Sequence, residues 1–138
     1  MMPALPYVSP AFVSLTYQAG QHVALQWKLS DGSEPELKAL YTYVLQVMIA
    51  QRAPRLLSDH RLRPPLSMSL QHWLQTEWIP QAIREARYSH CAIVESSNPI
   101  GRLAARAIGM AVNPALAVQY FQTSEEAAAW LRQAPPAR

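Results

Sequence analysis

The 138-residue chain has little of several residue types, and each shortage excludes a class of protein. One cysteine cannot form an internal disulfide, so the reducing cytosol is the expected compartment. Four glycines leave little room for a glycine-rich phosphate loop. No stretch approaches the roughly 18 consecutive apolar residues that indicate a membrane span. These shortages predict a cytoplasmic protein without a membrane span.

Charge is also scarce, because charged residues make up 15% of the chain and the net charge is +3. Nucleic-acid-binding domains carry a concentrated basic face, which a balance this small does not indicate. The first residues lack a basic segment followed by a long apolar run, so we expect no secretory signal. Apolar side chains are abundant at half of the sequence, enough for a hydrophobic core and for apolar surface that a partner covers.

Hydrophobic periodicity predicts the element order β-β-α-β-α-β-α-β-α. The strands are predicted over residues 12–17, 22–29, 55–59, 91–94 and 116–121. The helices are predicted over residues 33–51, 67–86, 98–112 and 123–132, with Ser67 or Ser69 as the cap of the second. Pro80 is expected to kink or divide the second helix, because its ring clashes with the preceding turn. The order indicates an α/β fold with a mixed five-stranded sheet packed with four helices.

The chain is expected to form a single domain over residues 1–138, because no interior linker interrupts the pattern. Its ordered core is predicted over about residues 12–132. The proline-rich ends, residues 1–10 and 134–138, are expected to be loose tails. The helix over residues 98–112 carries small residues that permit close packing on the sheet.

The first helix has apolar residues on more than one face. A surface helix normally carries polar residues on the face opposite its core-facing stripe. Here the apolar residues Tyr43 and Val47 lie largely off the stripe that is expected to face the core. One interpretation is an interface with a second copy or another protein. The other is that residues 7–10 fold over this face. Trp73 and Trp78 lie on apolar stripes too, and are the further candidates for an interface.

The loop after the third strand is the best candidate for a ligand site. In open α/β sheets, ligands bind beyond the carboxyl ends of the strands, and helix N-termini there attract anions. The candidate ligand-binding residues are Asp59, His60, Arg61, Arg63, Ser67 and Asn98. The other interpretation is that the aspartate and the arginines form local ion pairs, while the serine and the asparagine only cap helices.

Metal and catalytic motifs are lacking. The four histidines are scattered, whereas a zinc site needs three or four convergent ligands. Cys91 lies in the most apolar strand and is expected to be an inert core thiol. Neither a nucleophile elbow nor another catalytic context surrounds the serines. We therefore expect no cofactor, no metal and no enzymatic activity.

Four segments together resemble small bacterial proteins of the STAS type, the fold of anti-sigma-factor antagonists. They are Leu56-Leu57-Ser58-Asp59, Glu77-Trp78-Ile79-Pro80, Gly101-Arg102-Leu103 and the ending from Phe121 to Leu131. The resemblance covers about residues 12–131 and implies a non-enzymatic regulatory or protein-interaction module, with a homodimer or a protein partner. STAS-like domains also share a broad architecture with lipid-carrier domains of the CRAL-TRIO type. A small anionic or lipid-like ligand is therefore the alternative.

One departure from the family concerns its phosphorylation switch. STAS antagonists that a kinase controls carry an acidic residue, a serine and a glycine-rich turn where the third strand enters the second helix. Asp59 fits the acidic position, but no glycine lies between it and Ser67. We therefore do not expect the switch here.

Overall fold

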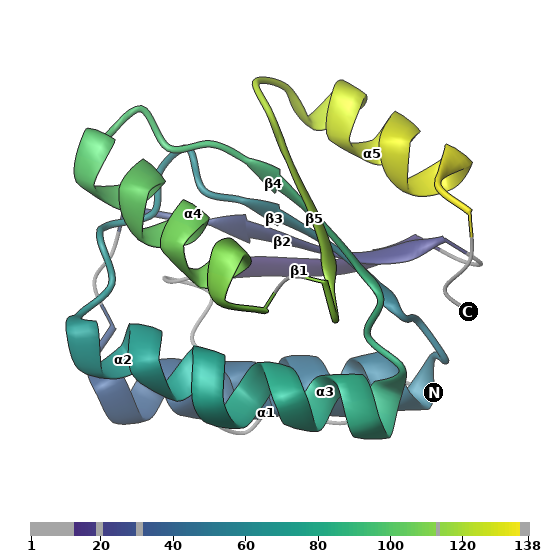
Figure 1. Ribbon diagram of the computed structural model, residues 1–138, viewed down its shortest axis with the longest axis horizontal. Coiled ribbons are helices and arrows are strands. Elements are labelled where there is room, and N and C mark those ends of the chain that lie inside the picture. Colours follow the sequence, from purple (N-terminus) through teal and green to yellow (C-terminus); the bar gives the residue numbers. More distant parts are fainter. Residues whose placement is uncertain (1–12, 19–20, 30–31, 113, 136–138) are drawn as a thin grey trace.

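The computed structural model describes residues 13–18, 21–29, 32–112 and 114–135 (Figure 1). Five strands form one sheet in the order of the sequence. They are β1 (Val13–Gln18), β2 (His22–Trp27), β3 (Arg55–Asp59), β4 (His90–Val94) and β5 (Ala117–Phe121). β1 pairs antiparallel with β2, and all later pairs are parallel. The α/β class and the mixed five-stranded sheet are confirmed. The predicted tail over residues 1–10 lies outside the described residues.

Four helical segments follow the strands in the predicted order. They are α1 (Glu34–Ala50), the continuous run of α2 (Met68–Trp73), η1 (Leu74–Trp78) and α3 (Ile79–Ala86), α4 (Pro99–Val112) and α5 (Ser124–Gln133). In the π-helical turn η1, the Ile79 N–H donates to the Leu74 carbonyl, five residues back. Pro80 follows directly and has no N–H to donate. The predicted division of this helix therefore takes the form of a widened turn.

Local capping sets where these helices begin. The Ser33 hydroxyl accepts from the Glu36 N–H at 3.3 Å, and the Glu36 carboxylate accepts from the Ser33 N–H at 3.0 Å. Thr123 accepts from the Glu126 N–H at 3.2 Å and so starts α5. Each cap satisfies a donor that the first helical turn leaves without an intrahelical partner.

The two faces of the sheet are covered unequally. Each crossover between parallel strands steps to the next strand in the same direction, and right-handed crossovers then place their helices on one side. Figure 1 shows α1, α2, α3 and α4 on this side, and α5 on the opposite side. We call these sides the helix-rich face and the α5 face.

The main core lies on the helix-rich face. Val23, Leu25 and Trp27 of β2 are at most 2% exposed and pack with α1 in one hydrophobic cluster. Tyr41 of α1 packs between Trp27 and Trp78, tilted against the first ring and edge-on to the second, with ring centroids 5.7 and 5.1 Å away. A smaller cluster joins α5 to the opposite face through Leu57, Ala92, Val94, Ala127 and Leu131.

Candidate functional site

Asp59 and Arg61 form a local ion pair at the end of β3. Asp59 is 5% exposed, and its carboxylate accepts from Arg61 Nη2 at 2.7 Å and from Arg61 Nε at 3.0 Å. Hydrogen bonding and charge attraction from Asp59 raise the pKa of Arg61. Arg61 Nη2 also reaches Ser124 Oγ at 3.4 Å, so the pair lies beside the start of α5. This geometry agrees with the interpretation as a local ion pair.

His60 and Arg63 belong instead to the helix-rich face. The Ser58 hydroxyl accepts from Trp27 Nε1 at 2.9 Å and lies 2.8 Å from His60 Nε2. Burial first, and the charge of Arg63 second, hold the pKa of His60 well below its ordinary value. Arg63 donates to the Tyr41 hydroxyl at 3.4 Å and lies over the Trp27 ring, 5.2 Å from its centroid. The structure therefore does not bring the two arginines together around one anion.

Ser67 and Asn98 both cap helices. The Ser67 hydroxyl accepts from the Leu70 N–H at 3.1 Å and donates to the Glu34 carboxylate at 2.9 Å. Asn98 Oδ1 accepts from the Ile100 N–H at 2.9 Å and from the Gly101 N–H at 3.3 Å. Capping accounts for these contacts, and ligand binding by the two residues remains a prediction.

Three of the four residues proposed for an interface are buried within the chain. Tyr43, Val47 and Trp78 are 3%, 0% and 3% exposed and belong to the main core. α1 contacts α3 in addition to packing in the core under the sheet, so it is buried on more than one face. The expectation that Tyr43 and Val47 lie off the core is therefore wrong. The alternative cover, residues 7–10, lies outside the described residues.

Trp73 is the one of these four that is partly exposed. Its ring lies 6.3 Å from that of Tyr41, and the Lys38 ammonium lies over it at 5.5 Å. These contacts fix the ring against α1. The apolar surface of these four residues is therefore largely covered within the chain.

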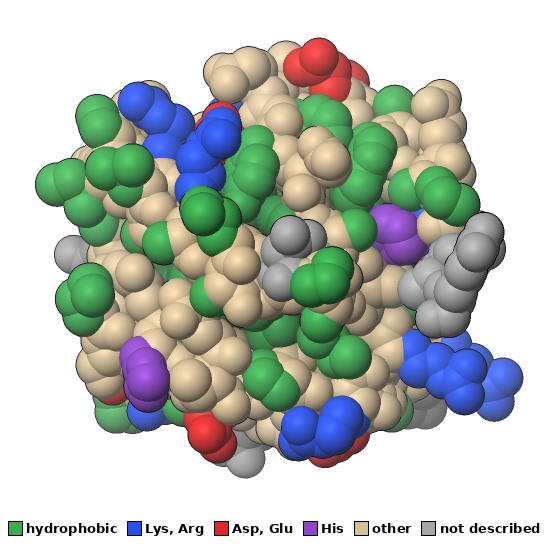
Figure 2. All heavy atoms as spheres, in the orientation of Figure 1, with side chains coloured by type: hydrophobic (Ala, Val, Ile, Leu, Met, Phe, Trp, Pro, Cys, Tyr) green, Lys and Arg blue, Asp and Glu red, His purple; other side chains and the backbone are tan. Residues whose placement is uncertain are grey.

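An exposed apolar face lies on α4, which buries three small residues and exposes three large apolar ones. Gly101, Ala105 and Gly109 are buried, while Ile100, Leu103 and Met110 are 66%, 70% and 79% exposed. The glycines allow close approach to the sheet, because a Cβ at position 109 would clash with the Tyr120 hydroxyl. Figure 2 shows hydrophobic side chains exposed over α4, at the left of the view. Contiguous exposed apolar patches mark interaction sites.

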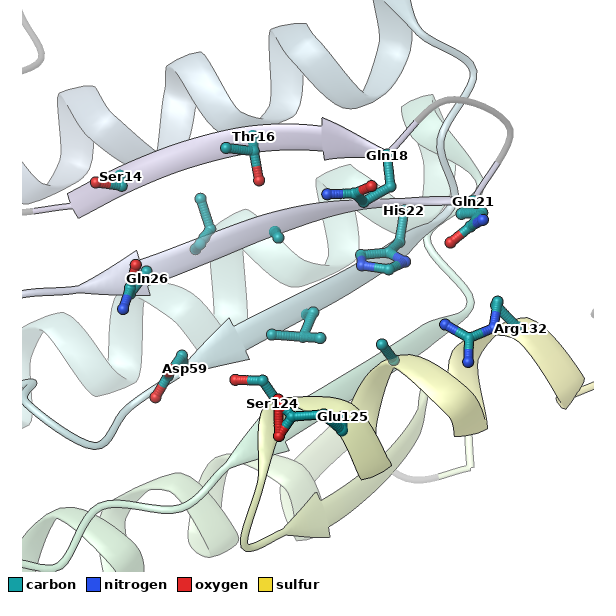
Figure 3. Close-up of a pocket in the computed structure, with 14 residues that line it drawn as sticks. Ser14, Thr16, Gln18, Gln21, His22, Gln26, Asp59, Ser124, Glu125 and Arg132 are labelled. Carbon is teal, nitrogen blue, oxygen red and sulfur yellow. The ribbon is translucent and has the colours of Figure 1, made fainter.

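A slot of about 500 Å³ opens on the α5 face, between α5 and the two first strands (Figure 3). Its polar lining comes from β1, β2, the end of β3 and α5. The lining includes Ser14, Thr16, Gln18, His22, Gln26, Asp59, Ser124, Glu125 and Arg132. The alternation of β1 and β2 in the sequence predicts this wetter face, but not the wall that α5 adds to it.

His22 is the unusual residue of the slot. It is 3% exposed, and its Nδ1 atom has no hydrogen-bond partner among the described residues. A buried polar atom without a partner costs about 1–3 kcal/mol. Burial, and to a lesser extent the charge of Arg132, lower the pKa of His22. Burial thus favours the neutral imidazole, one ring nitrogen of which lacks a partner among the described residues.

The helix-rich face holds a cavity of about 70 Å³. Cys91 lines it beside Tyr88, and burial raises the pKa of the Cys91 thiol to about 11. A thiol that stays protonated is a poor nucleophile, which agrees with the predicted inert role. Small-molecule sites measure about 300–1,000 Å³, so this cavity is too small for a ligand.

Within the described residues, no three His, Cys, Asp or Glu side chains converge as metal ligands would. In the same part of the chain, each helix is too short or too polar to cross a membrane. No protein-family model, curated protein or solved structure matches the sequence.

Proposed function

We propose that the protein is a non-enzymatic interaction module of the STAS-like type that forms a homodimer through α4. The element order and the mixed sheet support the STAS-like assignment, together with the four sequence segments that suggested it. One observation carries the functional proposal: α4 presents the three large apolar side chains of Ile100, Leu103 and Met110 to solvent.

The spacing of the exposed stripe favours a second copy of this chain as the partner. Ile100, Leu103, Ala107 and Met110 follow each other at intervals of three, four and three residues and are all exposed. Apolar residues at these intervals form the contact seam of paired helices. Because the intervals are the same in both directions, two antiparallel copies of α4 place Ile100 opposite Met110 and Leu103 opposite Ala107. A two-fold axis requires such self-complementarity.

The charges on α4 do not oppose this pairing. Its two charged residues are Arg102 and Arg106. Arg102 donates to the carbonyls of Ser96 and Ser97, and Arg106 forms an ion pair with Glu95 at 2.8 Å. Both guanidinium groups are thus engaged within the chain, and the stripe itself consists of apolar side chains.

The expected dimer is weak. A standard interface buries about 800 Å² on each partner, more than the three large side chains of the stripe supply. We therefore expect a dissociation constant in the micromolar range, and a monomer–dimer equilibrium that shifts with protein concentration.

Sedimentation equilibrium over a range of concentrations tests the proposal. Leu103→Glu places a charge in the seam and should convert the protein to a monomer. Met68→Glu is the matched control, because Met68 is a 78% exposed apolar residue on α2. It should leave the dimer intact. A wild-type protein that stays monomeric at high concentration would contradict the proposal, as would equal loss of dimer in the two variants.

A charge pair tests the antiparallel register. Ala107→Lys alone should weaken the dimer. Combined with Leu103→Glu, it places opposite charges across the seam and should restore part of the association. If the double variant is no more dimeric than either single variant, the antiparallel pairing of α4 is wrong.

A further inference from the structure

The slot on the α5 face lies on the side of the sheet opposite α4, and the proposed dimer does not use it. Its volume of about 500 Å³ falls within the range of about 300–1,000 Å³ typical of small-molecule sites. Figure 3 shows that its walls come from β1 and β2 on one side and from α5 on the other. The slot is thus a candidate ligand site that shares no residue with the proposed dimer interface on α4.

His22 indicates that a ligand completes the slot. The residue is 3% exposed, and its Nδ1 atom lacks a partner among the described residues. Figure 3 shows the ring between the strands and α5, on the side of the slot where Arg132 lies. Buried polar atoms in proteins are nearly always hydrogen-bonded. A residue that lines a cavity and holds a polar atom without a partner is therefore a natural contact for a ligand.

The charges around the slot differ between its two ends. Arg132 is exposed beside His22, and no ion pair joins it to a carboxylate of the described residues. A guanidinium beside an imidazole favours a carboxylate, which can accept hydrogen bonds from both. At the other end lie Glu125 and the Asp59 carboxylate, which Arg61 already binds. A second negative group on the ligand would meet Glu125 there.

Polar, uncharged side chains line the slot along its length. Gln18 lies opposite His22, Thr16 opposite Ala24 and Gln26 beside Asp59, and their hydroxyl and amide groups can donate and accept hydrogen bonds. Ala24 and Ala128 are small and leave room between the strand and the helix. Hydroxyl or amide groups on a ligand would find partners along this stretch.

We propose that the slot binds a small monocarboxylate whose body carries hydroxyl or amide groups. The carboxylate lies at His22 and Arg132, and the body extends along β2 toward Gln26. These two ends of β2 are four residues apart, or about 13 Å, which is long enough for a six-carbon sugar acid. The acidic far end excludes a dicarboxylate of the same length.

A titration of the full-length protein tests the chemical class. Two monocarboxylates serve as probes, gluconate for hydroxyl groups and N-acetylalanine for an amide. Glucose lacks the carboxylate, and glucarate adds a second one. At least one monocarboxylate should bind at millimolar concentration, shift the NMR resonances of the His22 ring and bind more tightly than glucose and glucarate. Binding of neither monocarboxylate would overturn the proposal, and so would glucose binding equally well.

Variants then test the position of the carboxylate. Arg132→Gln changes an exposed residue and should lower the affinity about tenfold, because a charge-assisted contact is lost. Arg84→Gln is the matched control, since Arg84 is also exposed but lies on α3, on the other face of the sheet. It should bind like the wild type. His22→Ala should abolish binding. If that variant does not fold, an unchanged affinity of Arg132→Gln is still sufficient to reject the site.

Discussion

The two faces of this sheet share the same strands but differ in what covers them. Along β2, Val23, Leu25 and Trp27 point to the helix-rich face and are almost fully buried. Their neighbours His22 and Gln26 line the slot on the α5 face, where Gln26 is exposed. Alternation along a strand separates the two sets of side chains, but it does not decide how well each set is covered.

The number of helices on each face explains the difference. Five strands at a spacing of about 4.8 Å span roughly 19 Å between the outer two, whereas one helix is about 10 Å wide. Three crossover segments cover most of the helix-rich face. α5 packs on β3, β4 and β5, so Thr16, Gln18 and Gln26 of the first two strands stay exposed beside it. A polar slot at the edge of a single helix is the consequence.

The largest effect is expected from a cavity on the helix-rich face. Leu40→Ala removes a side chain that is 0% exposed in the main core, and should lower the free energy of unfolding by about 3–4 kcal/mol. Leu131→Ala makes the same change at a residue 2% exposed on α5. It should lower the free energy of unfolding by only about 2 kcal/mol, because α5 covers a partly exposed face and can move to fill part of the cavity.

Urea unfolding of both variants measures the two losses in the free energy of unfolding. Equal losses, or a larger loss for Leu131→Ala, would show that the two faces are packed alike. That outcome would contradict the conclusion that the helix-rich face is covered more fully than the α5 face.

An intermediate effect is expected from acid. Burial lowers the pKa of His60, so the unfolded chain binds a proton that the folded protein resists. The resulting stability is present above the unfolded pKa of about 6.5 and is lost as the pH falls below it, by at most about 1.4 kcal/mol per pH unit for each such histidine. His22 and His90, whose pKa values burial also lowers, add to the loss.

His60→Gln isolates the contribution of the helix-rich face. This variant should lose less stability than the wild type when urea unfolding at about pH 7 is compared with unfolding at about pH 5. Identical losses in the two proteins would mean that His60 takes up its proton without unfolding, and that the face around it is more open than the structure indicates.

The smallest effect is expected on the open part of the α5 face. Thr16→Val changes an exposed residue of β1 and should alter the free energy of unfolding by less than about 0.5 kcal/mol. Thermal unfolding of this variant beside the wild type is a sensitive check. A loss comparable to that of Leu131→Ala would indicate that the face is covered where the structure leaves it open.

Features that depend on neighbours in the chain could be predicted from the sequence. Ser33 and Thr123 start helices as predicted, because a cap bonds to backbone only three residues away. β3 has the predicted bounds, and Pro80 follows the widened turn. The wetter face of β2 could be predicted too, since alternation is a local pattern. These features make up most of the fold.

Features that depend on distant segments could not be predicted. The apolar residues of α1 suggested either an external partner or cover by residues 7–10, but Tyr43 and Val47 are buried in the chain's own core. The exposed stripe of α4 depends on which side of that helix meets the sheet. His22 becomes a candidate ligand contact only because α5, more than a hundred residues later, closes one side of the slot.

The sequence by itself therefore determined the elements, their order and which side chains share a face of each element. Only the tertiary structure decided which of those faces are covered. The physical reason is that periodicity is set by backbone geometry within one element, whereas burial depends on what packs against it. Here the shared direction of three crossovers left one helix for the whole α5 face, and that distribution produced the slot.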